Sequence, residues 1–306
     1  MTTNITASGD FAGHADDDAC YPKSVLGKVH LILGAFGDGY VRVKLSELSR
    51  RAGLPKPTTH RLARELVRWG LLEQRDEWYQ LGVRVFELGQ RTVVATALRD
   101  VSRPHLADLF AETRATTHLV VSEGDHVLFI DKIAGTGDRN SATEAGCRLP
   151  ATCTAGGKLL LACRDSNYQI ALRYAHVSLD RLTPRSLRSV DQLIAEANNI
   201  RRAGFAIDLE ENAPGYCSIA LPVVTSDRQV QAAVSITRRA SYITAPPLIS
   251  HLRTAASSIA RAIETSPLLQ HVEDANPFSL DSHQPEPTPS NPRAKTAHGH
   301  RHSAPA

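Results

Sequence analysis

The 306-residue chain has no apolar run long enough to cross a membrane, because no stretch approaches the roughly 18 uncharged apolar residues that such a helix needs. The first 18 residues have no basic region followed by an apolar run, and they end in three acids. They do not resemble a secretory signal. We therefore expect a cytoplasmic protein without a membrane partner.

The chain has only five cysteines, an odd number that a framework of internal disulfides would leave unpaired. They also lack the close pairs that are typical of a structural zinc site. Free thiols in a reducing compartment are the simplest interpretation, and we expect neither a metal nor a cofactor. The cysteines are Cys20, Cys147, Cys153, Cys163 and Cys217.

The charge is small overall and uneven along the chain. Hydrophobic residues make up 42% and charged residues 22%, as in ordinary globular proteins, and the length suits two domains. The net charge is +3, yet residues 40–75 contain nine Lys or Arg against three Glu. Such a local excess is typical of a surface that contacts nucleic-acid phosphates, although an ordinary solvated face would look the same by charge alone.

The basic segment coincides with a compact series of predicted elements. Residues 1–20 show no periodicity and are predicted to be disordered. Residues 21–82 then predict helices from Ser24, over 45–51 with Ser46 as the cap, and over 55–69, followed by strands at 71–74 and 78–81. Two helices, a four-residue turn, a third helix and a two-stranded ribbon indicate a winged helix-turn-helix.

The third helix separates an inner face from a basic outer face. Thr59, Leu62, Ala63, Leu66 and Val67 share one side at the helical period. Such a helix would read base edges with its first turns, and Arg61 or Arg64 could pair with a guanine. A small packing module with surface charges is the alternative. The DNA-binding candidates are Arg42, Lys44, Lys56, Thr58, His60, Arg61 and Arg64.

The rest of the chain predicts a linker and a second domain. An apolar helix over about 83–98, within a linker of 83–100, is too hydrophobic to stand alone and is expected to pack on a partner chain or on the domain. Residues 101–266 mix strands with helices and predict an α+β domain. Residues 267–306 are rich in proline and predict a disordered tail. The strands are expected at 118–122, 126–133, 204–211, 218–225 and 231–238, and the helices at 103–113, 155–162, 190–202 and 248–264.

Motifs in both halves resemble the IclR family of regulators. In the first half the resemblance rests on LPKPTTHRL at 54–62, WGLL at 69–72 and YQLG at 79–82. In the second half it rests on GCRLP at 146–150, CTAGGKLLLA at 153–162, GFAIDLEE at 204–211, GYCSIA at 215–220 and AAVSI at 232–236. The resemblance covers residues 24–265 in the right order.

This resemblance implies a GAF-like effector-binding domain joined to the winged helix, a homodimer or tetramer, and a small organic ligand that tunes affinity for operator DNA. The chain departs from the family pattern in having Cys217 just before the position of the usual cysteine, and Thr59 where an aliphatic residue is usual. The ligand residues carried over by position are Ala155, Gly156, Asp208, Tyr216, Ser218, Ser235 and Thr237.

The same segment is interpretable without the family. Ala155-Gly156-Gly157 at a helix start would expose backbone N–H groups to an anion such as a carboxylate, although an ordinary tight loop is the alternative. It is not a phosphate-binding Walker loop, because Thr152 stands where the first glycine should be.

Two functions remain in competition, beside a third class, a DNA-binding protein that responds to partner proteins through its predicted disordered tail. The first is a DNA-binding regulator, with repression the better hypothesis, that responds to a small acidic metabolite. The alternative is an enzyme of the second domain with Asp208, Glu210 or Glu211 as acid or base. No nucleophile signature accompanies these carboxylates, so acidic surface or ligand-gating residues are the preferred interpretation and an enzyme is not expected.

Overall fold

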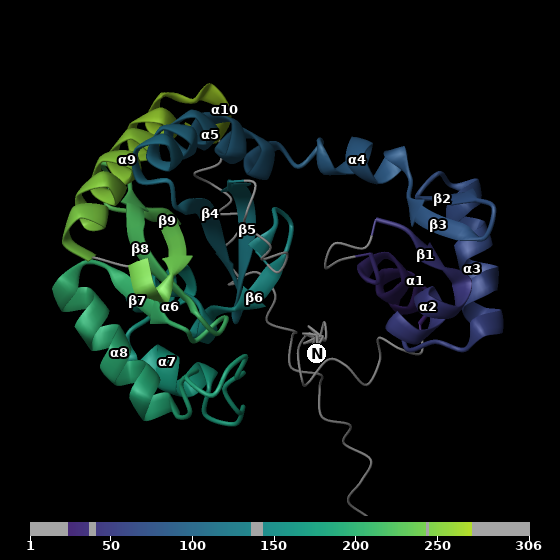
Figure 1. Ribbon diagram of the computed structural model, residues 1–306, viewed down its shortest axis with the longest axis horizontal. Coiled ribbons are helices and arrows are strands. Elements are labelled where there is room, and N and C mark those ends of the chain that lie inside the picture. The colour runs from purple at the N-terminus through teal and green to yellow at the C-terminus, as the bar shows by residue number, and fades with distance from the viewer. Residues whose placement is uncertain (1–23, 37–40, 136–142, 243–244, 271–306) are drawn as a thin grey trace, which may run out of the picture.

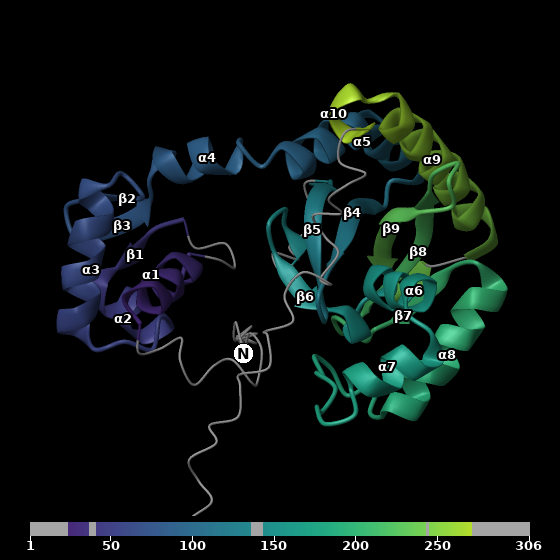
Figure 2. The same ribbon diagram turned by 180° about the vertical axis from the view of Figure 1, so that it is seen from behind.

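The computed structural model describes residues 24–36, 41–135, 143–242 and 245–270. The predicted disordered segments lie outside these residues, except for the start of the tail, where Pro267–Gln270 form the short helix α10. In Figure 1 the described residues form two folded regions joined by α4 (Val83–Gly89) and the start of α5 (Val93–Thr113), and Figure 2 shows the same arrangement from behind.

The first region is the predicted winged helix-turn-helix. The third helix begins at Lys56, with Pro57 in the first turn, where a missing N–H costs no hydrogen bond. The sheet order is β1-β3-β2, so the two wing strands pair and a short extra strand joins their edge. The elements are α1 (Val25–Gly34), β1 (Val43–Lys44), α2 (Leu45–Arg51), α3 (Lys56–Arg68), β2 (Leu72–Arg75) and β3 (Trp78–Leu81).

Apolar residues from all three helices and the wing form one core, which includes Ile32, Leu48, Leu62 and Leu72. The predicted cap of α2 is wrong, because Lys44 rather than Ser46 precedes the helix and its side chain makes no capping hydrogen bond. The reason is that Lys44 still pairs with Trp78 in the sheet, so the helix begins directly at Leu45.

The linker differs from the sequence prediction. A single helix over 83–98 was expected, but α4 ends at Gly89 and a new helix, α5, runs from Val93 through Pro104 to Thr113. Proline in a helix interior costs a hydrogen bond and introduces a clash. Buried residues on both sides of it, including Leu98, Leu106 and Leu109, hold α5 together against the sheet.

The second region has a six-stranded antiparallel sheet in the order β6-β5-β4-β9-β8-β7. Its strands and helices match the predicted segments to within a few residues, and β6, α7 and α10 were not predicted. They are β4 (Thr116–Glu123), β5 (His126–Ile133), β6 (Arg148–Pro150), α6 (Ala155–Arg164), α7 (Asn167–Arg173), α8 (Val190–Ala203), β7 (Ala206–Leu209), β8 (Tyr216–Val224), β9 (Val230–Arg239) and α9 (Ala245–Thr265).

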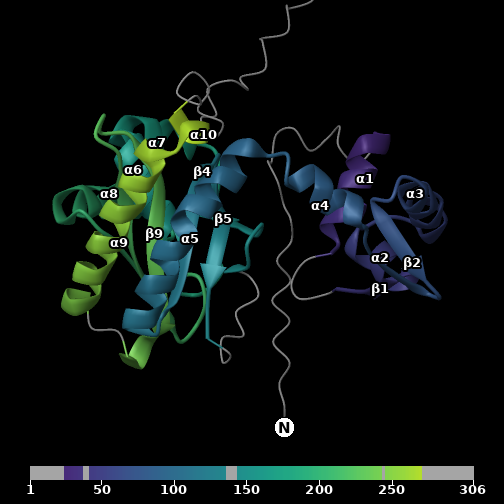
Figure 3. The same ribbon diagram turned by 90° about the horizontal axis from the view of Figure 1, so that it is seen from above.

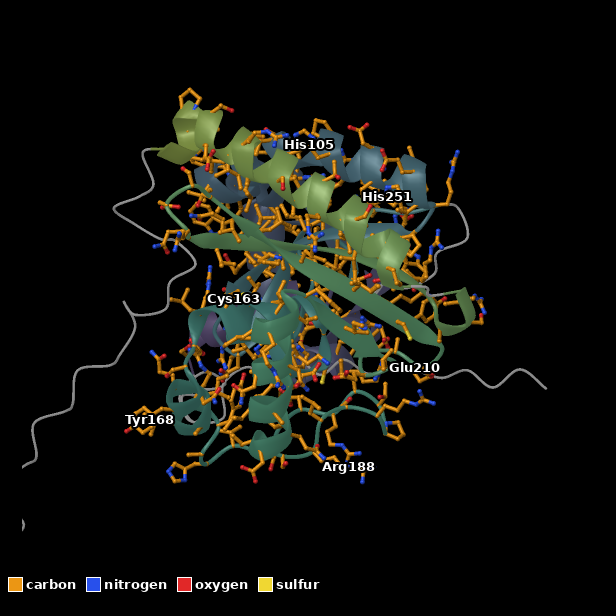
Figure 4. All side chains as sticks on the ribbon, turned by 90° about the vertical axis from the view of Figure 1, so that its left-hand side faces the viewer. His105, Cys163, Tyr168, Arg188, Glu210 and His251 are labelled. Atoms are coloured by element: carbon orange, nitrogen blue, oxygen red, sulfur yellow. The ribbon has the colours of Figure 1, made fainter. Side chains whose placement is uncertain are left out.

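Helices cover both faces of this sheet. On one face α5 and α9 lie side by side over one apolar cluster, and on the other face α6 and α8 cover a second (Figure 3). Figure 4 shows His105 and His251 in the first helix layer and Cys163, Tyr168 and Arg188 on the opposite side. An antiparallel sheet between helix layers confirms the predicted α+β, GAF-like class.

Candidate functional sites

The outer face of α3 has cations that no described carboxylate neutralises. Lys56, Arg61 and Arg64 are exposed and form no ion pair with a described residue, and His60 is exposed beside them. Thr58 is half-buried. Free guanidinium and ammonium groups on the first turns of a recognition helix are suited to contact DNA phosphates or guanine edges.

Other basic residues of the same region form contacts with neighbouring residues of the domain. Arg42 donates to Gln80 Oε1 at 3.0 Å, and Lys44 contacts Glu77 at 2.7 Å and lies over the Trp78 ring. Arg50 and Arg51 both bind Glu47, and their hydrogen bonds lower the pKa of that carboxyl to about 2. The basic residues of segment 40–75 therefore fall into two groups: those paired within the domain, and those on α3 that are free to contact DNA.

Thr59 shows how the chain accommodates its departure from an aliphatic residue. Its side chain is fully buried, and its hydroxyl donates to the carbonyl oxygens of Pro55 at 3.1 Å and Leu54 at 3.4 Å. The hydroxyl thus has partners in the core, as a buried polar group requires.

In the second region a cavity opens between the sheet and the N-terminus of α6. It has a volume of about 310 Å³ including its open mouth. Side chains leave room inside it for only about one water molecule. A metabolite would have to displace lining side chains. The lining residues are His118, Val120, Phe129, Thr143, Thr154, Ala155, Gly156, Asp208, Asn212, Ser218, Ser235 and Thr237.

Six of the seven proposed ligand residues line this cavity. Asp208, Ser218 and Thr237 lie in one row across β7, β8 and β9, and the Ser218 and Thr237 hydroxyls are 2.9 Å apart. Ser235 is two residues along β9, and Ala155 and Gly156 begin α6. Tyr216 is not among the lining residues; its ring lies under the Arg239 guanidinium.

The sequence analysis missed the β4 and β5 side of the cavity. His118 is buried, pairs with Ser235 in the sheet and meets Phe129 edge to face, with ring centroids 5.3 Å apart. A signal was available, because alternate residues of a strand share one face and both 118 and 120 belong to the predicted strand. Its pairing with β9, more than 100 residues away, could not be predicted from local pattern.

The N-terminus of α6 is closely packed and capped from one side. Thr154 Oγ1 accepts from Gly157 N at 3.0 Å, while the N–H groups of Ala155 and Gly156 have no acceptor in the described residues. A Cβ on Gly157 would lie 2.3 Å from the Ala151 carbonyl oxygen, so only glycine lets the helix approach this closely. Two free N–H groups at a helix start attract a negative group.

A buried acid–base group lies behind the cavity. The Lys158 ammonium donates to Glu211 Oε1 at 2.5 Å and to the Ile207 carbonyl at 2.8 Å. Desolvation by burial raises the pKa of Asp208 to about 7, and the neighbouring Glu211 charge acts in the same direction. The acidic-surface half of the expectation is wrong for Asp208 and Glu211, because both are buried and Glu211 is held by Lys158, while ligand gating stays a prediction.

The displaced cysteine points away from the cavity. Strand alternation places Ser218 among the lining residues and turns buried Cys217 to the other side of β8, where burial raises the pKa of its thiol. The cavity therefore has a hydroxyl where the family pattern has a thiol.

One ion pair connects the middle of α5 to the sheet. The buried carboxylate of Asp131 accepts from Arg103 at 2.7 and 2.9 Å, and Arg99 lies 3.7 Å away. An irregularity in the β4–β5 pairing skips Ile130, so Asp131 turns toward α5 while Phe129 lines the cavity. The cavity wall and α5 are thus joined through Phe129 and Asp131, which lie two residues apart on β5.

Within the described ranges, no helix is long and apolar enough to span a membrane. In that same part of the chain, no cluster of three or more His, Cys, Asp or Glu side chains could hold a metal ion.

A winged helix with free cations on its recognition helix, joined by a helix to a domain with a small cavity, defines a two-domain DNA-binding regulator. Comparison with known proteins gives the family. Residues 25–76 match the IclR helix-turn-helix domain, and residues 90–264 match the domain described as bacterial transcriptional regulator IclR C-terminal. The chain belongs to the IclR family and is a DNA-binding transcriptional regulator.

Three relatives illustrate the match. The HTH-type transcriptional regulator XynR of Escherichia coli (strain K12) is 30% identical over 237 residues, covering 76% of this chain and 94% of that protein. The transcriptional repressor IclR of the same strain is 30% identical over 206 residues, covering 66% and 75%. An IclR homologue from Microbacterium hydrocarbonoxydans, crystallised with 4-hydroxybenzoate, has a TM-score of 0.69 and 27% identity, covering 79% and 100%.

Proposed function

We propose that this protein is a repressor whose affinity for its operator is tuned by a small organic acid. The observation that carries the proposal is the cavity at the α6 N-terminus, which lies on a sheet that Asp131 and Arg103 connect to α5, the helix that continues from the linker. Repression requires only that the bound protein occlude the promoter, and the related E. coli protein IclR is a repressor. Operator binding requires the compartment that holds the DNA, the cytoplasm.

For the DNA contact we propose that Lys56, Thr58, His60, Arg61 and Arg64 bind the operator directly. Their position on the first turns of α3 supports this role. Arg42 and Lys44 are proposed to flank the contact from the wing side, where Lys44 also supports Trp78.

For the effector we propose a carboxylate held by the N–H groups of Ala155 and Gly156, with hydroxyl contacts from Ser218, Ser235 and Thr237. Asp208 lies at the β7 end of the same cavity, and Tyr216 acts from its rim. The relative crystallised with 4-hydroxybenzoate supports a small acid as the ligand class. This is the role that helix N-termini commonly play for anions.

An enzyme built on the same cavity is the alternative to this proposal. Asp208 is the only carboxyl among the described lining residues, and no cluster of three or more described His, Cys, Asp or Glu side chains there could hold a catalytic metal ion. Incubation with candidate acids should leave each compound chemically unchanged. Turnover that is lost in Asp208→Asn would instead establish the enzyme.

The test of the proposed function is a gel shift on the DNA upstream of the protein's own gene, with and without candidate aromatic and aliphatic acids. Arg64→Ala should weaken operator binding by about 1–3 kcal/mol if Arg64 pairs with a base. Arg188→Ala, an exposed arginine of the second domain (Figure 4), is the matched control and should bind normally. Equal losses of operator affinity in both variants would contradict the proposal that α3 contacts the operator.

A further inference from the structure

Among the described residues, the cavity lining includes a carboxyl group but no lysine or arginine. Asp208 and His118 are the ionisable residues of that described lining. Asp208 is only 2% exposed. An acidic effector that enters this cavity therefore meets a buried acid, and the helix N–H groups are the fixed positive end of the site.

Lys158, the nearest buried cation, is already committed. Its ammonium has three donors. They bind Ile207 O at 2.8 Å, Glu211 Oε1 at 2.5 Å and Glu196 Oε1 at 3.4 Å. The second oxygen of Glu211 is buried and has no hydrogen-bond partner among the described residues. No donor of Lys158 is left for Asp208 or for an incoming anion.

The Asp208 carboxyl has one oxygen engaged and one available. Oδ1 accepts from Glu211 N at 2.6 Å and from Asn212 N at 3.3 Å, whereas Oδ2 makes no hydrogen bond to a described residue. Asp208 aligns with Thr237, while Gly156 of α6 lies over Ala233, four residues earlier on β9. The anion-binding end of the cavity and Asp208 therefore lie at different positions along the strand direction of the sheet.

The surroundings of Asp208 favour the uncharged acid. Burial, together with Glu211 in the loop after β7, raises the pKa of Asp208 to about 7. Lys158 on α6 opposes this, and Glu210, Cys217 on β8 and His118 on β4 are the other ionisable groups around it. A second negative charge in the same cavity would disfavour ionisation of Asp208 further.

We propose that Asp208 binds the effector as an undissociated carboxylic acid, so that one proton enters the cavity with each effector anion. The proton comes from solvent, stays on Oδ2 and is donated in a hydrogen bond to an oxygen of the effector. Asp208 thereby selects acids that present an acceptor oxygen at the end remote from the α6 N-terminus. This inference rests on the acidic effector of the proposed function.

The test is calorimetric titration of the full-length protein with 4-hydroxybenzoate and pyruvate across neutral and mildly alkaline pH. Each titration is repeated in two buffers that differ in ionisation enthalpy. For the acids that bind, affinity should fall by about tenfold per pH unit above the Asp208 pKa, with uptake of about one proton per acid bound at pH 8. In Asp208→Asn, whose amide keeps a donor and an acceptor, binding should persist without proton uptake and without that pH dependence.

Glu210→Gln is the matched control, because it removes a neighbouring carboxylate that is outside the described cavity lining and lies near the edge of the domain (Figure 4). It should keep the wild-type pH profile. Binding of an acid with no proton uptake by the wild type would overturn this inference and leave the proposed function intact. Failure of both acids to bind at any pH would count against the acidic effector itself, and against this inference with it.

Discussion

At the scale of single residues, buried charges tie the helices of the second domain to its sheet. Lys158 on α6 binds the carbonyl of Ile207 and the carboxylate of Glu211, and Asp131 on β5 binds Arg103 on α5. Removing one partner of a buried pair leaves an uncompensated charge in a poorly solvated place. Replacing one of these residues should therefore lower the free energy of unfolding more than replacing a surface charge.

The first prediction concerns the stability contributed by Asp208. Its pKa is raised from 3.8 to about 7, so the folded state favours the protonated acid. The resulting stabilisation is complete below pH 4 and is lost as the pH rises toward 7, with a total on the order of 4 kcal/mol. Urea unfolding of wild type and Asp208→Asn between pH 4 and pH 8 should show that the variant lacks this fall. Parallel stability curves would contradict the prediction.

The second prediction concerns the Arg103–Asp131 pair. Arg103→Ala should lower the free energy of unfolding by about 2 kcal/mol, because it leaves the Asp131 carboxylate buried with only the more distant Arg99. Arg148→Ala is the control, since its partner Glu123 is partly exposed and the loss should stay within about 0.5 kcal/mol. Chemical denaturation measures both, and equal effects would show that Asp131 is solvated in the variant.

At the scale of elements, α6 is positioned by its glycines and its cap. Gly156 lies against Val120 and Gly157 against the backbone of Ala151, so the helix start is pressed onto the sheet beside the cavity. Thr154 fixes the end by capping Gly157 N. The same residues that give close packing also hold the free N–H groups toward the cavity.

Gly157→Ala should therefore destabilise the protein and weaken binding of an acidic effector. A Cβ would lie 2.3 Å from the Ala151 carbonyl oxygen, which only a backbone shift can relieve, and we expect a loss of about 3 kcal/mol. Gly89→Ala in α4 is the control, because nothing lies within 4 Å of its Cβ and helix propensity should make it neutral or slightly stabilising. Thermal unfolding compares the two variants. Equal melting temperatures for Gly157→Ala and wild type would show that the backbone near Ala151 shifts at little cost in stability.

The elements also show how far sequence pattern reaches. Local periodicity predicted α3, the wing and the main strands of the sheet, because each is amphipathic or alternating over its own length. Helix α7 was missed although Ser166 and Gln169 form a capping box that the sequence displays. The continuation of α5 through Pro104 and the contribution of His118 to the cavity depend on contacts distant in sequence, which no local pattern contains.

At the scale of the whole molecule, apolar side chains without cover gather on the connection between the two regions. Val83 and Phe86 lie one helical turn apart on α4 and are 63% and 65% exposed. Leu88 and Val93 are exposed nearby, and Leu26 on α1 is 81% exposed. Exposed apolar clusters of this kind are typical of subunit interfaces. We propose that α4 contributes to the homodimer contact, which would set the distance between two recognition helices.

Phe86→Asp should shift the protein toward the monomer, because a carboxylate would be buried without a partner in the proposed contact. Leu172→Asp is the matched control: Leu172 is an exposed apolar residue of α7 in the second domain, and its replacement should leave the oligomer intact. Sedimentation velocity measures the oligomeric state.

A gel shift on a two-half-site operator should show at least a roughly tenfold loss of affinity for Phe86→Asp, since each monomer then binds one half-site alone. If Leu172→Asp dissociates the protein and Phe86→Asp does not, the subunits meet through the effector domains, and α4 only connects the DNA-binding domain to the sheet that carries the cavity.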